Sequence, residues 1–294
     1  WHLVMAKALG VRVERFALGF GPKLFSFIRK GTEYAVCLIP LGGYVKMAGD
    51  ERSECKGDAK EFYSKPVGHR ALIVLAGPIV NYVFAFLCFC WVFMIGYPTM
   101  GTKIGEVMKG YPAQAAGLQV SDKIISIDSI KVDSWEDVQG SIGRSRSDQI
   151  IVAVERNNAP MIISLNPIKE EVKNIFGQKI QARVVGIKPE EKIVLLRYGF
   201  FESITKASAK LVSITTTTYK ALYLMMTGGM STKEGITGPI GIFFIIKKAA
   251  ELGFSYVLYI MAVISASLAI FNLLPLPVLD GGHLLFFGIE KVRG

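Results

Sequence analysis

Two long stretches of this 294-residue sequence contain no charged residue: residues 71–97 and residues 252–279. About 20 consecutive apolar residues let a helix cross the hydrocarbon core of a bilayer, and both stretches exceed that length. The sequence is 51% hydrophobic with a mean hydropathy of +0.39, which is too apolar for an ordinary soluble domain of this size. The missing charge therefore predicts a membrane protein with a mainly α-helical transmembrane core.

Cysteine is also scarce, and its four residues form no disulfide framework or zinc knuckle. Cys37 and Cys55 fall on the side predicted below to be cytoplasmic, where disulfides are rare. Cys88 and Cys90 lie inside a predicted span and are two residues apart, so on a helix they point about 200° away from each other. We interpret them as apolar packing residues. No internal repeat, low-complexity tract or signal peptide stands out in these residues.

The net charge of +10 is not gathered into one basic stripe, which argues against a nucleic-acid partner. Residues 1–70 hold 12 basic and 7 acidic residues, while residues 101–190 hold 12 and 11. Basic residues in short loops mark the cytoplasmic side of a membrane. Those flanking the two uncharged stretches predict that both ends are cytoplasmic and that residues 101–251 lie outside: Lys65, Arg70, Lys291 and Arg293.

A third apolar segment, residues 211–246, is interrupted by charges and by several glycines. The interrupting charges are Lys220, Lys233 and Glu234. A broken segment of this kind favours amphipathic or interfacial helices over a full span. We therefore expect an interfacial helical region over residues 191–250, between transmembrane segments at residues 70–98 and 252–294.

Between the spans, residues 101–190 alternate short apolar runs with turn residues, which is typical of a small β-rich domain. The order of parts resembles a PDZ domain: a strand IGEV, the turn GYPAQAAGL, a strand DKIISIDSIKV, a helix capped by Ser134 with Asp137 three residues on, and two strands around Asn157 and Asn158. Such domains accept an extended peptide as an added strand, so we expect it to bind peptide termini or a substrate's outer domain. A domain that only plugs or spaces is the alternative.

Residues 11–49, within a predicted hairpin region that extends over residues 11–69, show strand-length alternation that is broken by GFGP, RKGTE and PLGG. These breaks are typical of hairpins, and the strands are too apolar for a water-exposed sheet. We expect membrane-associated β-hairpins on the cytoplasmic side that dip into the membrane interface against protein. An edge strand there could pair with an unwound substrate segment, although a purely structural hairpin explains the pattern equally well.

Asp280 is the first charge after residues 252–279, within the sequence NLLPLPVLDGGH. A carboxylate close to hydrocarbon is costly and needs a partner. Three roles stay open at this point: an ion pair, a helix cap with Gly281 and Gly282, or a metal ligand. Pro275 and Pro277 predict that the helix breaks before Asp280, which would free backbone groups inside a protein-lined cavity.

Six motifs occur in an order that resembles the site-2 protease family, in its bacterial branch with a single PDZ-like domain. They are WHLVMAKALGVRVERFALGFGP, PLGGYVKMAGD, AGPIVN, the PDZ-like domain, GPIGI and NLLPLPVLDGGHLLF, and together they cover nearly the whole chain. The resemblance implies that residues 1–10 end the helix that carries the zinc-binding HExxH motif. One departure is Trp1, since the family often has a small residue before the second histidine.

The resemblance implies that His2 is the second histidine of HExxH and that both His2 and Asp280 are zinc ligands. The first histidine and the catalytic glutamate would precede Trp1. Two histidines and one carboxylate would then hold zinc with a fourth position open for water. The zinc would lower the pKa of that water, and the glutamate would take its proton and pass it to the leaving amine.

The resemblance also assigns substrate-binding positions. Asn272 matches a position that contacts the substrate backbone, and Pro275 and Pro277 match the broken stretch beside the metal. Asn81 matches too, although an interhelical hydrogen bond would equally explain it. His283, three residues after Asp280, has a spacing that suits chelation. It is not a ligand position in the family, so we interpret it as a polar residue at a helix start, and His69 as an interfacial side chain.

The resemblance predicts an intramembrane zinc metalloprotease that cleaves transmembrane segments of single-span membrane proteins, such as anti-sigma factors or remnant signal peptides. It would be a multi-pass protein of the bacterial cytoplasmic membrane, with the lipid bilayer as its surroundings and no nucleic acid as partner. The alternative hypothesis is a non-catalytic membrane scaffold. In that case the PDZ-like domain would bind protein termini and Asp280 would only cap a helix.

Overall fold

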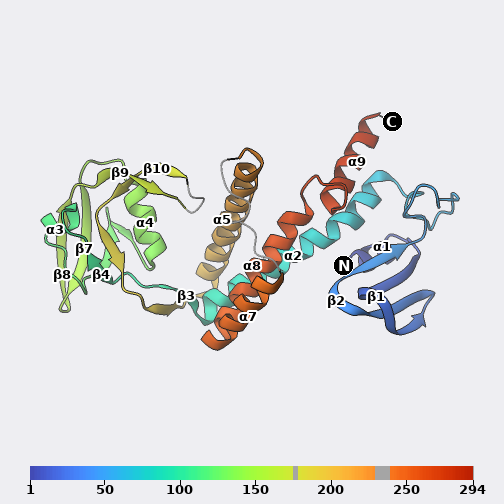
Figure 1. Ribbon diagram of the computed structural model, residues 1–294, viewed down its shortest axis with the longest axis horizontal. Helices are drawn as coiled ribbons and strands as arrows, with labels where there is room; N and C mark the ends of the chain where they lie inside the picture. The colour runs from blue at the N-terminus through green and yellow to red at the C-terminus, as the bar shows by residue number, and fades with distance from the viewer. Residues whose placement is uncertain (175–177, 229–238, 294) are drawn as a thin grey trace. The chain divides into compact units, whose positions relative to one another are not determined.

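The computed structural model describes residues 1–174, 178–228 and 239–293 (Figure 1). The chain divides into two compact units. The first unit comprises Trp1–Phe86 and Val263–Gly294, and the second comprises Leu87–Ala262. Two long helices contribute residues to both units: α2, Val67–Ile95, and α8, Phe254–Asn272.

The first unit also contains α1, His2–Ala8, the strands β1, Val13–Arg29, and β2, Thr32–Met47, and the helix α9, Asp280–Arg293. Its core joins the first and the last segments of the chain. The buried side chains come from α1, β1, the loop after β2, α2 and α9: Ala6, Val11, Val13, Phe62, Ile73, Val74 and Phe287. Burial of this apolar set holds α9 against α1 and α2, which positions the site described below.

The predicted hairpins form one hairpin with bent strands. Only the RKGT turn joins two strands, whereas GFGP lies within β1 and PLGG within β2. The bends still appear in the register, because Ala17 lies opposite both Tyr44 and Ala35. Gly19 has a φ of +87°, and a Cβ there would lie 2.5 Å from the carbonyl oxygen of Ile39. The bend in β1 therefore requires glycine at this position.

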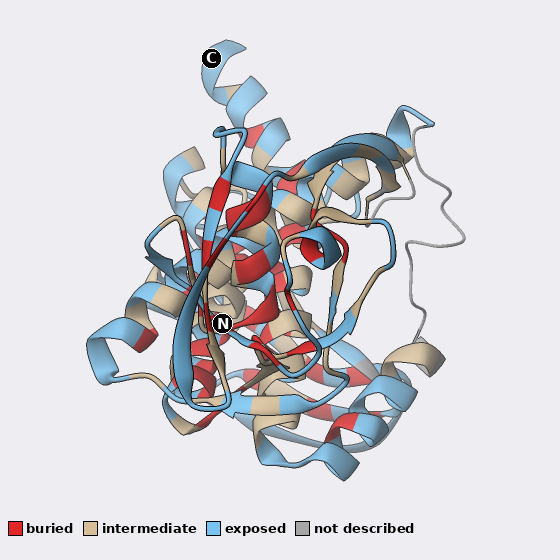
Figure 2. Cartoon of the chain, turned by 90° about the vertical axis from the view of Figure 1, so that its left-hand side faces the viewer, coloured by how far each residue is buried: buried red, intermediate tan, exposed pale blue. Residues whose placement is uncertain are grey.

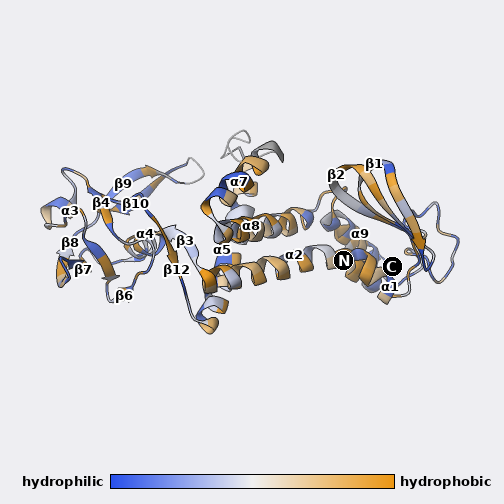
Figure 3. Cartoon of the chain, turned by 90° about the horizontal axis from the view of Figure 1, so that it is seen from below, coloured by the Kyte–Doolittle hydropathy of each residue, from blue (hydrophilic) through white to orange (hydrophobic). Residues whose placement is uncertain are grey.

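The helices α2 and α8 are long and apolar enough to cross a membrane, with mean hydropathies of 2.3 and 2.1 (Figure 3). Within the first unit, Ser265 on α8 donates a hydrogen bond to the backbone carbonyl of Asn81 on α2 at 2.9 Å. The interhelical hydrogen bond considered for the Asn81 side chain is thus made by its main chain. Ala266 and Ala269 are fully buried, and such small side chains let membrane helices approach closely.

The second unit holds the β-rich domain. Its elements are β3 Tyr97–Met100, β4 Ile104–Val107, α3 Pro112–Ala115, β5 Lys123–Ile127, β6 Ile130–Lys131, α4 Trp135–Arg144, β7 Ile150–Arg156, β8 Ala159–Leu165, β9 Ile168–Lys173, β10 Lys179–Val184, β11 Ile187–Pro189 and β12 Ile193–Leu196. The strands pair as β6-β5-β7-β8, β9-β10, β4-β11 and β3-β12. The buried residues, red in Figure 2, include a single cluster from Ile104 to Val185 that α4 helps to cover.

One strand prediction in this domain is wrong. The segment DKIISIDSIKV forms two antiparallel strands, β5 and β6, instead of one. Asp128 and Ser129 adopt positive φ angles of 47° and 65°, and these two residues form the tight turn between β5 and β6. Asp and Ser side chains tolerate such turns, and the apolar residues on either side concealed the turn in the sequence.

Among its described residues, the predicted interfacial region contains the helices α5, Phe200–Met226, and α7, Pro239–Leu252. Lys220, which interrupts the apolar run in the sequence, lies within α5, and the helix continues to Met226. A long Lys side chain can direct its charge away from apolar surroundings while its stem stays on the helix. Lys233, Glu234 and the first residue of GPIGI lie outside the described residues.

The start of α4 is closed by a capping box. Ser134 Oγ accepts a hydrogen bond from the Asp137 amide at 3.2 Å, and Asp137 Oδ2 accepts one from the Ser134 amide at 3.0 Å. We expect Ser134→Ala to destabilise α4 by about 1 kcal/mol, which is roughly a fivefold loss of amide exchange protection in this helix. Hydrogen–deuterium exchange of the full chain measures it. Ser164→Ala, at an exposed position of β8, is the control and should leave α4 unchanged.

Candidate functional site

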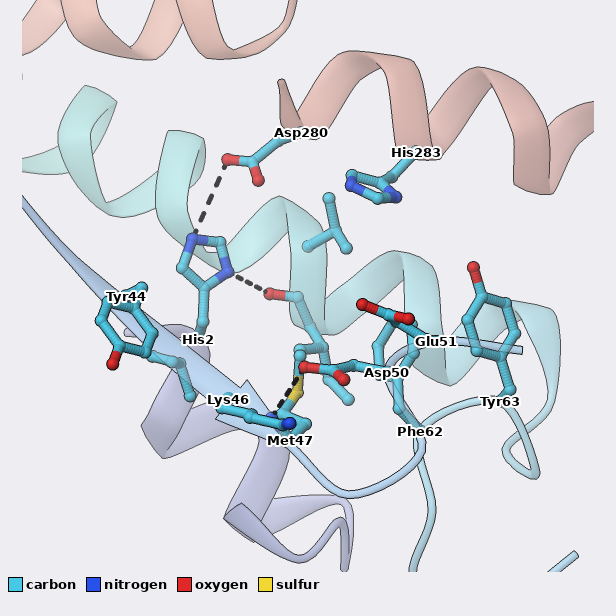
Figure 4. A pocket seen from close by; sticks show the side chains of 13 residues that line it. His2, Tyr44, Lys46, Met47, Asp50, Glu51, Phe62, Tyr63, Asp280 and His283 are labelled. Atoms are coloured by element: carbon cyan, nitrogen blue, oxygen red, sulfur yellow. Dashed lines mark hydrogen bonds and ion pairs between the residues drawn. The ribbon is translucent and has the colours of Figure 1, made fainter. Parts of the chain in front are cut away.

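A cavity of about 500 Å³ lies in the first unit (Figure 4). Its walls come from α1, β2, the loop after β2, α2 and α9. The lining residues are His2, Tyr44, Val45, Lys46, Met47, Asp50, Glu51, Phe62, Tyr63, Ile73, Val74, Asp280 and His283. Two residues predicted to hold a metal, His2 and Asp280, therefore line one cavity although they come from opposite ends of the sequence.

A backbone carbonyl sets the orientation of His2. Its Nδ1 lies 2.8 Å from the carbonyl oxygen of Ile73 on α2, and a carbonyl can only accept a hydrogen bond. Nδ1 therefore carries the proton, and the lone pair of Nε2 is free to act as a ligand. Nε2 faces Asp280 Oδ2 at 3.8 Å, which is too long for a hydrogen bond (Figure 4).

Asp280 is the first residue of α9. The helical chain is broken between the end of α8 at Asn272 and Asp280. Gly281 and Gly282 let the loop before α9 fold onto its first turn. A Cβ at Gly281 would overlap the carbonyl oxygens of Leu273 and Leu274. The two glycines therefore turn the Asp280 side chain towards His2 by permitting this close backbone approach.

Gly77 on α2 makes the space beside this pair. A Cβ built at Gly77 would overlap Nε2 of His2 and would lie 3.4 Å from Oδ2 of Asp280. Any larger side chain would occupy the position where the two ligand atoms converge. The glycine of the AGPIVN motif thus leaves both donor atoms accessible to a third atom.

These residues fit zinc. A neutral imidazole nitrogen and a carboxylate oxygen are common zinc donors, and two donors in a tetrahedral zinc site lie about 3.4 Å apart. The separation of 3.8 Å between His2 Nε2 and Asp280 Oδ2 is within about half an ångström of that spacing. The bond from His2 to Ile73 is the kind of outer contact that fixes a zinc-binding histidine. No three His, Cys, Asp or Glu side chains converge among the residues described, so this pair supplies two donors of the predicted set.

The structure places the other predicted site residues elsewhere or at the margin. His283 lines the same cavity, but it is exposed, and its ring lies 6.3 Å from that of Phe287. Four predicted substrate-binding residues are absent from the described lining of the cavity: Asn81, Asn272, Pro275 and Pro277. The two prolines are exposed in the loop between α8 and α9. Trp1 is 65% exposed, so its indole lies outward.

Several site residues had no role assigned from the sequence. The strand segment from Tyr44 to Met47 forms one wall of the cavity. The backbone carbonyl of Ile73 orients His2, and Gly77 leaves space beside His2 because it has no side chain. The motifs PLGGYVKMAGD and AGPIVN contain most of these residues. The sequence identified both motifs, but only the packing assigns their functions.

Comparison with known proteins gives a family match over the whole chain. The model described as "Peptidase family M50" matches residues 1–294. A relative from Clostridium acetobutylicum is 34% identical, covering 100% of this chain and 82% of its own length, and one from Agrobacterium fabrum is 33% identical with the same coverage. Both names contain the words zinc metalloprotease. Zinc metalloprotease RasP of Oceanobacillus iheyensis is 29% identical over 100% of this chain and 87% of its own.

Among solved structures, PDZ domains of SdrC-like proteins match part of the chain. The domain from Listeria monocytogenes is 18% identical with a TM-score of 0.25, covering 30% of this chain and 86% of its own. The domain from Listeria innocua is 20% identical with the same TM-score, covering 31% and 96%. Similarity at that level does not establish the fold of the β-rich domain.

We expect Gly77→Ala to weaken zinc binding by tenfold or more, since the added methyl group overlaps His2 Nε2. Competition with a chelator in the purified full chain measures the affinity. Gly68→Ala is the matched control on the same helix, because a Cβ there meets nothing within 4 Å. Both changes favour helix formation, so helix loss cannot explain a difference. Equal zinc affinity of the two variants would contradict the assigned role of Gly77.

Proposed function

The chain belongs to peptidase family M50 and is a zinc metalloprotease, and we propose that it cleaves peptide bonds within or near the transmembrane segments of single-span membrane proteins. The observation that carries the proposal is the convergence of His2 and Asp280 at Gly77 in one cavity. This convergence lies beside α2, which has the length and apolarity of a membrane span. Such a site suits hydrolysis at membrane depth.

The residues of this chain hold and orient the metal site in the proposed reaction. Bound zinc supplies a Lewis acid that activates water and polarises the scissile carbonyl. His2 presents Nε2 because its Nδ1 proton is held by Ile73, and Asp280 presents a carboxylate at the start of α9. The general base is expected to be the glutamate of the HExxH motif, which would precede Trp1.

A stretch of β2 is the proposed binding edge for the substrate. Four consecutive residues, from Tyr44 to Met47, line the same cavity as His2 and Asp280. This stretch pairs with β1 through Arg15, Phe16 and Ala17. A helical amide is shielded by its own hydrogen bonds, so the substrate must unwind before cleavage, and an extended segment can then pair with a strand. Asn272, Pro275, Pro277 and Asn81 remain predicted substrate contacts.

The β-rich domain is proposed to select substrates. It would dock peptide termini or a substrate's outer domain, or it would act as a size filter that admits only shortened substrates. The elements that support a PDZ-like role are the capped helix α4 and the hairpin of β7 and β8 at Asn157 and Asn158. Membrane-anchored anti-sigma factors and remnant signal peptides are the proposed substrates, and the bacterial cytoplasmic membrane is the proposed location.

The rival hypothesis, a non-catalytic scaffold, makes a different prediction for zinc. In a scaffold Asp280 caps α9 and no metal is needed at His2. Membership of a metallopeptidase family favours the enzyme, as does the orientation of His2 Nε2 towards Asp280 instead of towards a hydrogen-bond donor.

We expect the purified full-length chain to contain close to one zinc ion and to cleave a single-span substrate inside its transmembrane segment. Asp280→Asn removes the carboxylate charge with little change in shape, so both zinc content and cleavage should be lost. Metal analysis and mass spectrometry of the cleaved substrate measure these outcomes. Asp148→Asn, at an exposed position in the second unit, is the control and should retain both. Unchanged zinc in Asp280→Asn would refute the ligand assignment, and cleavage only outside the membrane segment would refute intramembrane proteolysis.

A further inference from the structure

An ion pair joins the first turn of α2 to the last turns of α9, at the opposite end of α9 from Asp280. The guanidinium of Arg70 contacts Glu290 through two hydrogen bonds, Nη1 to Oε2 at 3.1 Å and Nη2 to Oε1 at 2.7 Å. The Arg70 side chain is only 4% exposed, while that of Glu290 is 31% exposed. A bidentate pair with a buried guanidinium is stronger and more directional than an ordinary surface ion pair.

The surroundings of Arg70 fix its side chain in place. Its Nε donates a hydrogen bond to the carbonyl of Lys65 at 3.0 Å. The guanidinium lies 5.2 Å from the ring centre of Tyr63 and 5.0 Å from that of Phe287. Arg52 also donates to Glu290 at 3.0 Å. Glu290, and with it α9, is therefore held at a defined position against α2 and the loop before it.

The same face of α2 carries the groups that shape the metal site. Arg70, Ile73 and Gly77 are spaced by three and four residues, so they lie on one side of the helix. Arg70 binds α9, the Ile73 carbonyl orients His2, and Gly77 leaves space between His2 and Asp280. Both zinc ligands are thus positioned from one helix face, His2 directly and Asp280 through α9.

We propose that Arg70 is a positioning residue for zinc binding: with Glu290 it fixes α9 along α2 and so sets the separation between Asp280 and His2. The inference rests on the proposed function of this site. Glu290 follows Asp280 by about 15 Å along a helix, which is a rigid connection over that length. A shift of α9 at Glu290 therefore moves the carboxylate of Asp280 relative to Nε2 of His2.

A second ion pair of the same chemistry provides a matched comparison. In the second unit, Arg156 binds Asp122 through Nε to Oδ1 and Nη2 to Oδ2, both at 2.7 Å, and Asp122 is 1% exposed. This pair has no metal ligand on its elements. Breaking it reports the effect of losing a buried bidentate pair on stability alone.

The test measures zinc affinity of the full-length chain in detergent, by competition with a chelator, together with thermal unfolding of the zinc-free protein. Arg70→Lys keeps the charge but loses the planar fork, and Glu290→Gln keeps the shape but loses the charge. We expect each to weaken zinc binding by about 10-fold to 100-fold. The double variant should be little weaker than either single variant, because both remove the same interaction. Asp122→Asn should lower the unfolding temperature and leave zinc affinity unchanged.

Three results would overturn the proposal. If the wild-type chain binds no zinc, the proposed function fails and this inference fails with it. If the wild type binds zinc and both Arg70→Lys and Glu290→Gln bind it with the same affinity, only the positioning role fails. If Asp122→Asn weakens zinc binding as much as they do, the effect is a general loss of stability, and the role of Arg70 is again refuted.

Discussion

The hydrogen bond between His2 and the carbonyl of Ile73 is the contact on which the site depends. It joins α1 to α2, places the proton on Nδ1 and leaves Nε2 facing Asp280. A carbonyl in the interior of a helix normally accepts a hydrogen bond from an amide of the same helix. Its oxygen has a second lone pair, which here accepts the hydrogen bond from His2 Nδ1. The orientation of the His2 ring is thus set by main-chain geometry, which a substitution at Ile73 would alter little.

Close backbone approach is the second constraint. Gly77 leaves room beside the side chains of His2 and Asp280, and Gly281 lets the loop from α8 fold onto the first turn of α9. Both glycines permit these close approaches because they lack a Cβ. In the same unit, Gly19 permits the bend in β1 that places one stretch of β2 between two stretches of β1. The shape of the cavity therefore depends on the absence of a side chain at Gly77 and Gly281 as much as on the side chains that line it.

Much of this candidate site could be predicted, because its chemistry depends on particular residue types at fixed spacings. The two uncharged stretches indicated the spans, the prolines indicated the break before Asp280, and family resemblance indicated zinc and His2. From the residues alone, the role of Asp280 stayed open among an ion pair, a cap and a ligand. Asp280 faces His2, which lies at the other end of the sequence. Local sequence patterns do not show which distant residues lie side by side in the fold.

The predictions failed where tertiary contacts decide. The turn at Asp128 is flanked by apolar residues that were predicted to form one continuous strand. The bent hairpin was anticipated as several separate hairpins, because glycine and proline signal a change of direction without stating whether pairing continues across it. The roles of Ile73, Gly77 and Arg70 are invisible to sequence patterns, since each acts through packing partners remote in the chain.

The assembly of the site from α1 and α9 has a consequence for biosynthesis. Asp280 follows the entire β-rich domain in the chain, so a nascent polypeptide that ends before α9 contains only one member of the pair formed by His2 and Asp280. The two side chains can come together only after the β-rich domain has been synthesised and α9 has packed beside α2. Completion of the site is therefore one of the last steps in the folding of the chain.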